Sequence, residues 1–464
     1  MKKYFILIFL CAFASYAYTQ ESNTLSNSEK IYGLSKFWSE VTYNFANFEN
    51  VPTLNWDSAY LAFIPKVLDS KSDDDYFDQL SKFAALLKDG HTNIWHPDNY
   101  YKELSEQEFG EYRFKLENIE NKAIVVRVNA SKVNEIPLGS EIIEVNDLPV
   151  DDYLEKNTIP IIHETTDYTR RDAAVKALLL GKFGQEFRIK LKTPGGEIKS
   201  LHLTVKTNKD NDVIPPFSSQ DSLFSFKWID NQIAYLSLNS FADSKIDSLF
   251  KEKLPELRKA KGIIIDVRKG RGGNESNGTY IAQYFIEDTV FSSHRTKTRK
   301  NLADMRYYGS MLSPSDTLHN PQAGDGYNCF HNNLWEDRGV VKWPNDIPKK
   351  DRLLVPVVIL MGHQTTSASE DFLLCFDKSK NVVKMGQYSC GSSGNLFEFK
   401  LVGGAKAGLC VSHVTYPDGR VYVGSGVKPD IQIEKTIDDV INNRDSVLEE
   451  AVKYLQSHKN TESY

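Results

Sequence analysis

The feature that most constrains the fold is an apolar run, residues 353–361, followed by the turn sequence Gly-His-Gln-Thr-Thr and then by Ser367-Ala-Ser-Glu370. An apolar run of this length that ends in a turn predicts a buried strand. Beyond the turn, Ala368, Phe372, Cys375 and Phe376 fall on one face of a helix, and residues 382–385 predict another strand. This order predicts an α/β core in which the helix begins at the carboxyl edge of the sheet.

Ser367 stands where this helix begins, and two interpretations compete for it. The positive end of a helix dipole and its unpaired N–H groups stabilise a developing oxyanion, which suits a nucleophile. The pattern Ser367-x-x-Glu370 is also a capping box, in which the serine only ends the helix. Taken alone, the pattern favours the cap, so the choice depends on the other motifs.

A glycine-rich loop follows a second predicted strand, residues 262–267. The loop contains Gly270, Gly272 and Gly273, and the acidic and basic pair Asp266 and Arg268 precedes it. Glycines let the backbone approach a ligand and turn N–H groups toward an anion. The alternative is a plain turn beside a structural ion pair. A phosphate loop is disfavoured because no Gly-Lys-Ser/Thr follows.

A serine hydroxyl needs a base to become a nucleophile. His91, in the sequence Asp89-Gly90-His91-Thr92, follows a predicted helix and a turn, and loops commonly hold catalytic groups. An isolated histidine in a turn is more often merely solvated. His363 and His413 are weaker candidates for the base, and His363 fits a structural role at the strand end.

At 464 residues the chain is too long for one core, so we expect several domains. Helical spacing predicts a helical N-terminal domain over 25–100, and alternating strands predict a small strand-rich domain over 105–208. The α/β core then covers 218–456, after a polar linker. An aromatic-rich insertion, residues 290–350, lacks strong periodicity and is predicted to be a lid or a substrate-binding excursion.

Residues 1–19 read as a signal peptide, since Lys2 and Lys3 precede an apolar run and small residues follow it. We expect an exported protein, periplasmic or extracellular, without a membrane anchor. Removal of the signal leaves four cysteines, which form up to two disulfides or remain thiols: Cys329, Cys375, Cys390 and Cys410.

The net charge of −6 provides no basic field for nucleic acid, which leaves peptides or small molecules as partners. The spacing of cysteines and histidines matches no metal site, and we expect neither a metal nor another cofactor. The oligomeric state cannot be predicted.

Three motifs occur in the order typical of tail-specific (C-terminal processing) and tricorn-like serine peptidases: Asp89-Gly-His-Thr92, Ile264-Ile-Asp-x-Arg-x-x-x-Gly272-Gly, and Thr365-x-Ser-Ala-Ser-Glu370. A fourth, Gly426-Val-x-Pro-Asp430, follows them, and residues 137–147 resemble part of a PDZ domain. The chain therefore resembles this family over nearly its whole length. The resemblance implies a layered ClpP/crotonase-like core with a PDZ-like domain.

The resemblance also implies catalytic roles. Ser367 becomes the nucleophile, and the backbone N–H groups of Ala368 and of Gly272 or Gly273 form the oxyanion hole. The lysine of the lysine-dependent branch is replaced by Ser392, so the tricorn-like branch is favoured, with His91 as base. The implied activity is that of an exported serine endopeptidase acting on peptides or unfolded proteins. The alternative is a non-catalytic protein of the same fold that binds an apolar ligand or docks a peptide.

Overall fold

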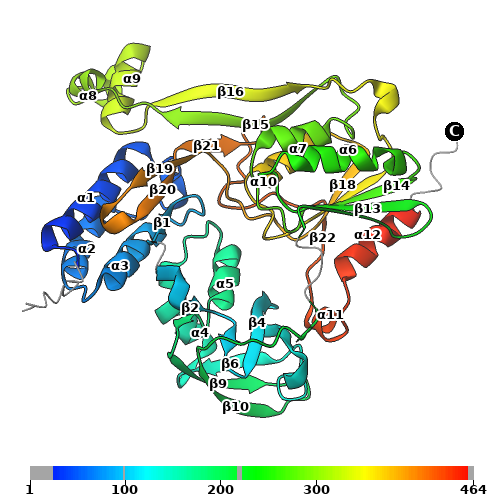
Figure 1. Cartoon of the computed structure of the whole chain (residues 1–464). Helices are drawn as coiled ribbons and strands as arrows, with labels where there is room; N and C mark the ends of the chain where they lie inside the picture. Colours follow the sequence, from blue (N-terminus) through cyan, green and yellow to red (C-terminus); the bar gives the residue numbers. More distant parts are fainter. Residues whose placement is uncertain (1–23, 98–99, 217–221, 458–464) are drawn as a thin grey trace, which may run out of the picture.

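The computed structural model describes residues 24–97, 100–216 and 222–457. The predicted signal peptide, residues 1–19, lies outside the described residues. Figure 1 shows an N-terminal group of helices, a strand-rich region, an α/β core and a long hairpin, and the chain passes between these parts more than once.

The N-terminal region is built from helices α1 (Asn27–Asn44), α2 (Trp56–Leu68) and α3 (Asp73–Ala85). The N-cap side chains Ser26, Asn55 and Ser72 accept hydrogen bonds from the first turns of the three helices, which fixes where each begins. Aromatic side chains fill the space between them, and Trp56 stacks on Phe83 with ring centroids 4.2 Å apart. The helices predicted from the sequence in this region are therefore present.

The strand-rich region contains an antiparallel sheet in which β10, β9, β6, β5, β4 and β3 are neighbours in that order. Helix α5 (Asp167–Lys176) packs beside β4. Whether this module is PDZ-like stays a prediction. The strands are β3 (Glu108–Phe109), β4 (Tyr112–Ile119), β5 (Lys122–Asn129), β6 (Glu141–Val145), β9 (Glu186–Lys192) and β10 (Ile198–Thr204).

The α/β core is a six-stranded sheet with the order β12, β13, β14, β17, β18 and β22, parallel except for β12. Its strands are β12 (Phe224–Trp228), β13 (Ile233–Leu238), β14 (Gly262–Asp266), β17 (Val357–Met361), β18 (Val382–Gly386) and β22 (Ile431–Gln432). Side chains of β14 and β17 alternate between two apolar clusters, one on each face. This explains why both strands are apolar throughout.

Helices cover both faces of this sheet (Figure 1). Helices α6 (Lys245–Leu257), α7 (Glu275–Ala282) and α10 (Ala368–Cys375) contribute to the cluster on one face. Helix α12 (Ser446–Ser457) closes the other face with Val447, Ala451 and Leu455. The α/β core predicted from the β17 and α10 sequence is thus present.

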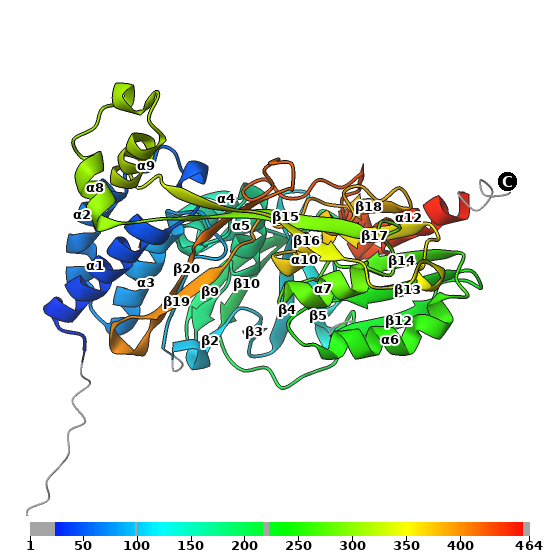
Figure 2. The same cartoon turned by 90° about the horizontal axis from the view of Figure 1, so that it is seen from above.

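The insertion after residue 290 is an ordered hairpin rather than an irregular excursion. Strands β15 (Val290–Arg299) and β16 (Trp335–Pro344) pair antiparallel, with α8 (Ala303–Gly309) and α9 (Pro321–Phe330) at the tip. Figure 2 shows the hairpin running from the core to the N-terminal helices. There Arg299 donates to the Thr42 carbonyl over 3.2 Å. Irregular pairing and a half-exposed face explain why periodicity did not reveal these strands.

A small three-stranded sheet joins an early segment of the chain to a late one. Strand β1 (Asn93–Trp95) pairs with β20 (Lys406–Cys410), which pairs with β19 (Leu396–Lys400). Apolar residues of this late segment, among them Leu401 and Leu409, belong to the core of the N-terminal helices. The loop that carries His91 is therefore held against residues more than 300 positions later in the sequence.

Across the described residues, no helix is long and apolar enough to cross a membrane. Cys329, Cys375, Cys390 and Cys410 are all buried free thiols. Of the two alternatives for these cysteines, the structure has the unpaired one.

Candidate active site

Parallel pairing of β14 with β17 brings two loops to the same edge of the sheet. One loop carries Gly272 and the other carries Ser367. Gly272 has a φ of +77°, and a Cβ added to it would lie 2.7 Å from the Ser367 Cβ. The position therefore requires glycine, both for its backbone conformation and for the close approach to the serine.

Ser367 begins helix α10 in a conformation unlike that of an ordinary N-cap. Its φ is +55° and its ψ is −126°, whereas an N-cap residue normally has extended backbone angles. A non-glycine residue held in such a region is strained, and strain of this kind clusters at active sites. The backbone N–H of Ser367 donates to Glu370 Oε2 over 3.1 Å and to the Ser392 carbonyl over 3.0 Å.

The structure brings His91 to this serine. His91 Nε2 lies 3.3 Å from Ser367 Oγ, close to the reach needed for a general base, and His91 Nδ1 lies 2.7 Å from Ser392 Oγ. Burial lowers the pKa of the His91 imidazole below its ordinary value, while the charge of Asp89 opposes this shift. Burial therefore favours the neutral imidazole, which is the form that can accept a proton.

The loop of His91 is anchored by the residues on either side of the histidine. Asp89 is buried and accepts hydrogen bonds from Thr92 Oγ1 at 2.6 Å and from Asn47 at 3.3 Å. Thr92 Oγ1 in turn accepts from the N–H of Cys410 in β20 at 3.2 Å. Burial raises the pKa of the Asp89 carboxyl, and its proximity to His91 and its hydrogen bonds act in the opposite direction.

Glu370 organises the other side of the site. Its fully buried carboxylate accepts from Ser389 Oγ at 2.6 Å and from the backbone N–H groups of Gly391, Ser367 and Ser392 at 2.7, 3.1 and 3.1 Å. Burial raises the pKa of Glu370 to about 8, although these donors favour the ionised form. Ser367 and Glu370 therefore form the capping box predicted from the sequence, and Ser367 Oγ also lies 3.3 Å from His91 Nε2.

Among the predicted oxyanion donors, the N–H of Gly272 donates to Ser369 Oγ over 3.2 Å. The N–H groups of Ala368 and Gly273 have no acceptor within the part of the chain that the structure describes. Ala368 is the first residue of α10, so its N–H lacks an intrahelical partner. The geometry leaves Ala368 and Gly273 available as donors.

The weaker candidates for the base lie in other interactions. His363 Nδ1 lies 2.5 Å from Asp172 Oδ2, and its ring packs against Tyr168. His413 lies beside Glu49, with Nδ1 3.0 Å from Oε1.

The acidic and basic pair before the glycine loop is structural. Arg268 contacts Asp266 and Asp445, each at 2.7 Å.

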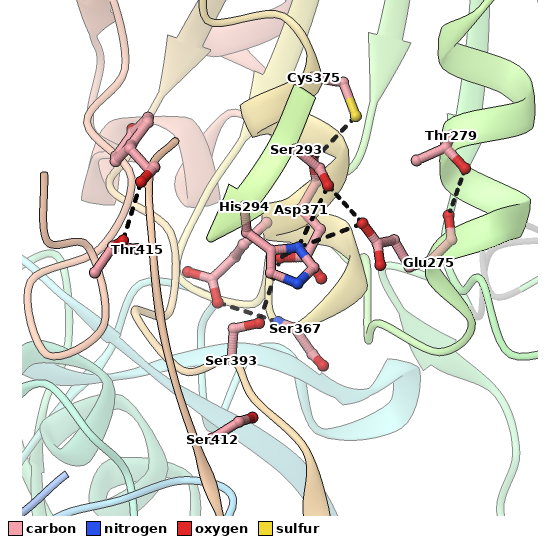
Figure 3. Close-up of polar contacts among 12 residues, drawn as sticks. Glu275, Thr279, Ser293, His294, Ser367, Asp371, Cys375, Ser393, Ser412 and Thr415 are labelled. Atoms are coloured by element: carbon pink, nitrogen blue, oxygen red, sulfur yellow. Dashed lines mark hydrogen bonds and ion pairs between the residues drawn. The ribbon is translucent and has the colours of Figure 1, made fainter. Parts of the chain in front are cut away.

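A second polar cluster, which the sequence did not reveal, lies beside Ser367 (Figure 3). His294 Nδ1, on β15, lies 3.3 Å from Glu275 Oε1 and 3.6 Å from Asp371 Oδ1. Burial lowers the pKa of His294, but the Glu275 hydrogen bond and the two carboxylates outweigh it and raise the pKa. Burial raises the pKa of Asp371 to about 6. The cluster ties the hairpin to the first turn of α10.

No group of three or more potential metal ligands occurs among the described residues. The predicted residues that the structure brings together are thus Ser367, His91, Ala368 and the Gly272–Gly273 turn. Sequence reasoning did not assign Ser392 a partner, although its position 25 residues after Ser367 had singled it out.

Comparison with known proteins identifies the class of this site. Residues 232–433 match the model of peptidase family S41. No match was found among curated proteins. A crystal structure of mature CPAF is similar with a TM-score of 0.66 and 13% identity, covering 93% of this chain and 96% of that one.

Two further structures share the fold. Mature CPAF complexed with lactacystin has a TM-score of 0.65 and 13% identity, with coverage of 93% and 98%. A crystal structure of a "putative peptidase" from Parabacteroides merdae has a TM-score of 0.51 and 19% identity, with coverage of 93% of this chain and 97% of that one. The family resemblance drawn from the motifs is confirmed for residues 232–433, which match peptidase family S41, and the chain is a serine peptidase.

Proposed function

We propose that this peptidase is an exported serine endopeptidase that cleaves peptides or unfolded proteins through an acyl-enzyme on Ser367, with His91 as the base. One observation carries the proposal: His91 Nε2 lies 3.3 Å from Ser367 Oγ, and that serine begins helix α10 with a strained φ of +55°. A capping serine requires neither the histidine nor the strain.

In the first half of the reaction, His91 Nε2 takes the proton from Ser367 Oγ as this oxygen attacks the scissile carbonyl. The carbonyl oxygen becomes an oxyanion, which the N–H groups of Ala368 and Gly273 stabilise at the positive end of α10. The protonated imidazole then gives its proton to the leaving amine, and the peptide bond breaks.

In the second half, water replaces the amine. His91 takes a proton from the water, and the resulting oxygen attacks the acyl carbonyl. The bond to Ser367 Oγ breaks, and His91 returns the proton to the serine. Each half begins with a neutral imidazole, which agrees with the direction in which burial shifts the pKa of His91.

The sequence supports the export and the substrate class. Residues 1–19 have the charge and apolar pattern of a signal peptide, and the net charge of −6 offers nothing to bind nucleic acid. The family match supports peptides or proteins as substrates.

A fluorophosphonate probe tests the nucleophile. We expect one covalent adduct, located by mass spectrometry on Ser367, and no adduct in Ser367→Ala. We also expect this variant to lose several orders of magnitude in kcat, because only binding and the oxyanion hole remain. If Ser367→Ala is active and merely about 0.5–2 kcal/mol less stable, the serine is a cap and the proposal is wrong.

A further inference from the structure

We infer that Ser392 is the positioning residue for His91: its hydroxyl accepts a hydrogen bond from Nδ1–H and so holds the imidazole with its Nε2 lone pair toward Ser367. The inference rests on the proposed function, in which His91 is the base. It assigns to this serine a role that its place in the sequence, where a lysine would have stood, does not suggest.

The geometry of the imidazole supports this role. A histidine that takes a proton on Nε2 must carry its own proton on Nδ1, so the Nδ1–H needs an acceptor. Ser392 Oγ is 2.7 Å from Nδ1, a short hydrogen bond, while Ser367 Oγ is 3.3 Å from Nε2. The two serines therefore hold opposite sides of one ring.

The neighbouring carboxylate of Asp89 does not take this place. Asp89 lies close enough to influence the charge of His91, but its oxygens accept from Thr92, Asn47 and the His91 backbone. Asp89 is thus a counter-charge to the imidazole rather than the acceptor of its ring proton.

Gly90 leaves the space that Ser392 needs. A Cβ added to Gly90 would lie 2.8 Å from Ser392 Oγ and 3.3 Å from Ser392 Cβ. Any side chain at position 90 would therefore press on the hydroxyl that faces His91. The absence of a side chain before the histidine and the presence of a hydroxyl at position 392 are two parts of one arrangement.

The backbone of Ser392 is fixed from the nucleophile side. Its N–H donates to Glu370 Oε2 at 3.1 Å, and its carbonyl accepts from the Ser367 N–H at 3.0 Å and from Thr366 Oγ1 at 3.1 Å. Ser392 is 2% exposed. The backbone of Ser392 is thus fixed to the loop of Ser367, and its hydroxyl contacts His91. Ser392 therefore sets the distance between Ser367 and His91.

Ser392 is not a second nucleophile. It lies in a loop after β18 and not at the N-terminus of a helix. Its backbone φ is not positive, in contrast to that of Ser367. A fluorophosphonate adduct on Ser392 in the wild-type chain would overturn the inference.

The first test is Ser392→Ala, with Ser393→Ala as the matched control. Ser393 is the next buried serine of the same loop and contacts Asp371 rather than His91. A buried Nδ1–H without an acceptor destabilises the ring orientation that the base needs, so we expect kcat to fall on the order of 10- to 100-fold in Ser392→Ala, with KM little changed. We expect Ser393→Ala to stay within about twofold.

The pH profile supplies a readout that a packing defect would not move. A hydrogen-bond acceptor on Nδ1 favours the imidazolium, so its loss lowers the pKa of His91. The acidic limb of kcat/KM should therefore shift to lower pH in Ser392→Ala, while the charge interaction between Asp89 and His91 is kept. An unshifted limb, or equal losses in the two serine variants, would overturn the inference.

The second test couples Gly90 to Ser392. We expect Gly90→Ala alone to reproduce much of the loss, because its Cβ displaces the hydroxyl, and to add little in the Ser392→Ala background. Additive losses would contradict the arrangement. If wild-type protein is not labelled at Ser367, the proposed function fails; if it is labelled and Ser392→Ala is normal, only this inference fails.

Discussion

The two halves of the active site are built in different ways. The nucleophile half comes from consecutive residues of the β17–α10 unit, and Gly272 approaches from the neighbouring parallel strand. The base half comes from a loop near the N-terminus, which β20 and the core of the helical region hold in place from the far end of the chain. Local structure positions the serine, whereas long-range contacts position the histidine.

This difference predicts where each half is vulnerable. The serine half stores strain in one turn, and Glu370 holds that turn together with the Ser392 loop through four hydrogen bonds. In the histidine half, Lys88 has a positive φ of +47°, three residues before the base. The position of His91 itself depends on hydrogen bonds such as the one between the Cys410 N–H and Thr92 Oγ1.

Among substitutions that leave Ser367 and His91 in place, the largest effect is expected for Glu370→Gln. The amide nitrogen cannot accept a hydrogen bond, and it replaces a carboxyl oxygen that faces two donors. The buried donors that lose their acceptor cost about 1–3 kcal/mol each. We expect several kcal/mol of lost unfolding free energy and a strong loss of activity, measured by urea unfolding and peptide hydrolysis. Glu449→Gln, at an exposed ion pair, is the control and should change little.

The stability difference between Glu370→Gln and wild type should also depend on pH. Burial raises the pKa of Glu370 to about 8, so between its ordinary value and 8 the folded state keeps a proton that the unfolded state has released. Stability from this group therefore falls as pH rises through that window. The advantage of wild type should be smaller at pH 8 than at pH 5, and a larger advantage at pH 8 would contradict the assignment.

A smaller effect is expected for Thr92→Val, which breaks the anchor of the base half. The variant keeps the shape but removes the hydroxyl between Asp89 and the Cys410 N–H, at a cost of about 1–3 kcal/mol in stability. We expect kcat to fall because His91 moves away from Ser367. The turn that holds Ser367 should keep its structure. Thr193→Val, in the strand-rich region, is the matched buried control. Equal activity in both variants would show that the base half is not positioned by this contact.

The difference between local and long-range positioning also explains which parts of the fold and of the site could be predicted from the sequence. The strand, turn and helix around Ser367 follow from an apolar run and a capping pattern, and they were predicted from those residues. The motif at His91 was recognised, but its pairing with Ser392 was not, because nothing local indicates that residues 91 and 392 meet. The hairpin strands β15 and β16 were missed because half-exposed, irregularly paired strands lack a clear period.

The smallest effect is expected for Asp89→Asn, which changes the charge beside the base. The Asp89 carboxylate raises the pKa of His91 against the lowering by burial, so its neutralisation should lower that pKa further. The acidic limb of kcat/KM should therefore move to lower pH. Asp172→Asn, which removes the partner of His363, is the control and should leave the limb in place. A shift to higher pH would contradict the electrostatic account.

The central claim, that the two halves meet as a serine and its base, is tested most directly by the pH dependence of kcat/KM on one peptide substrate. Wild type should show an acidic limb with an apparent pKa below the ordinary histidine value of about 6.5. His91→Ala should lose several orders of magnitude in rate together with this limb, and His363→Ala should keep both. If His91→Ala retains near-normal turnover while His363→Ala loses it, the base comes from the core and the account of two halves is wrong.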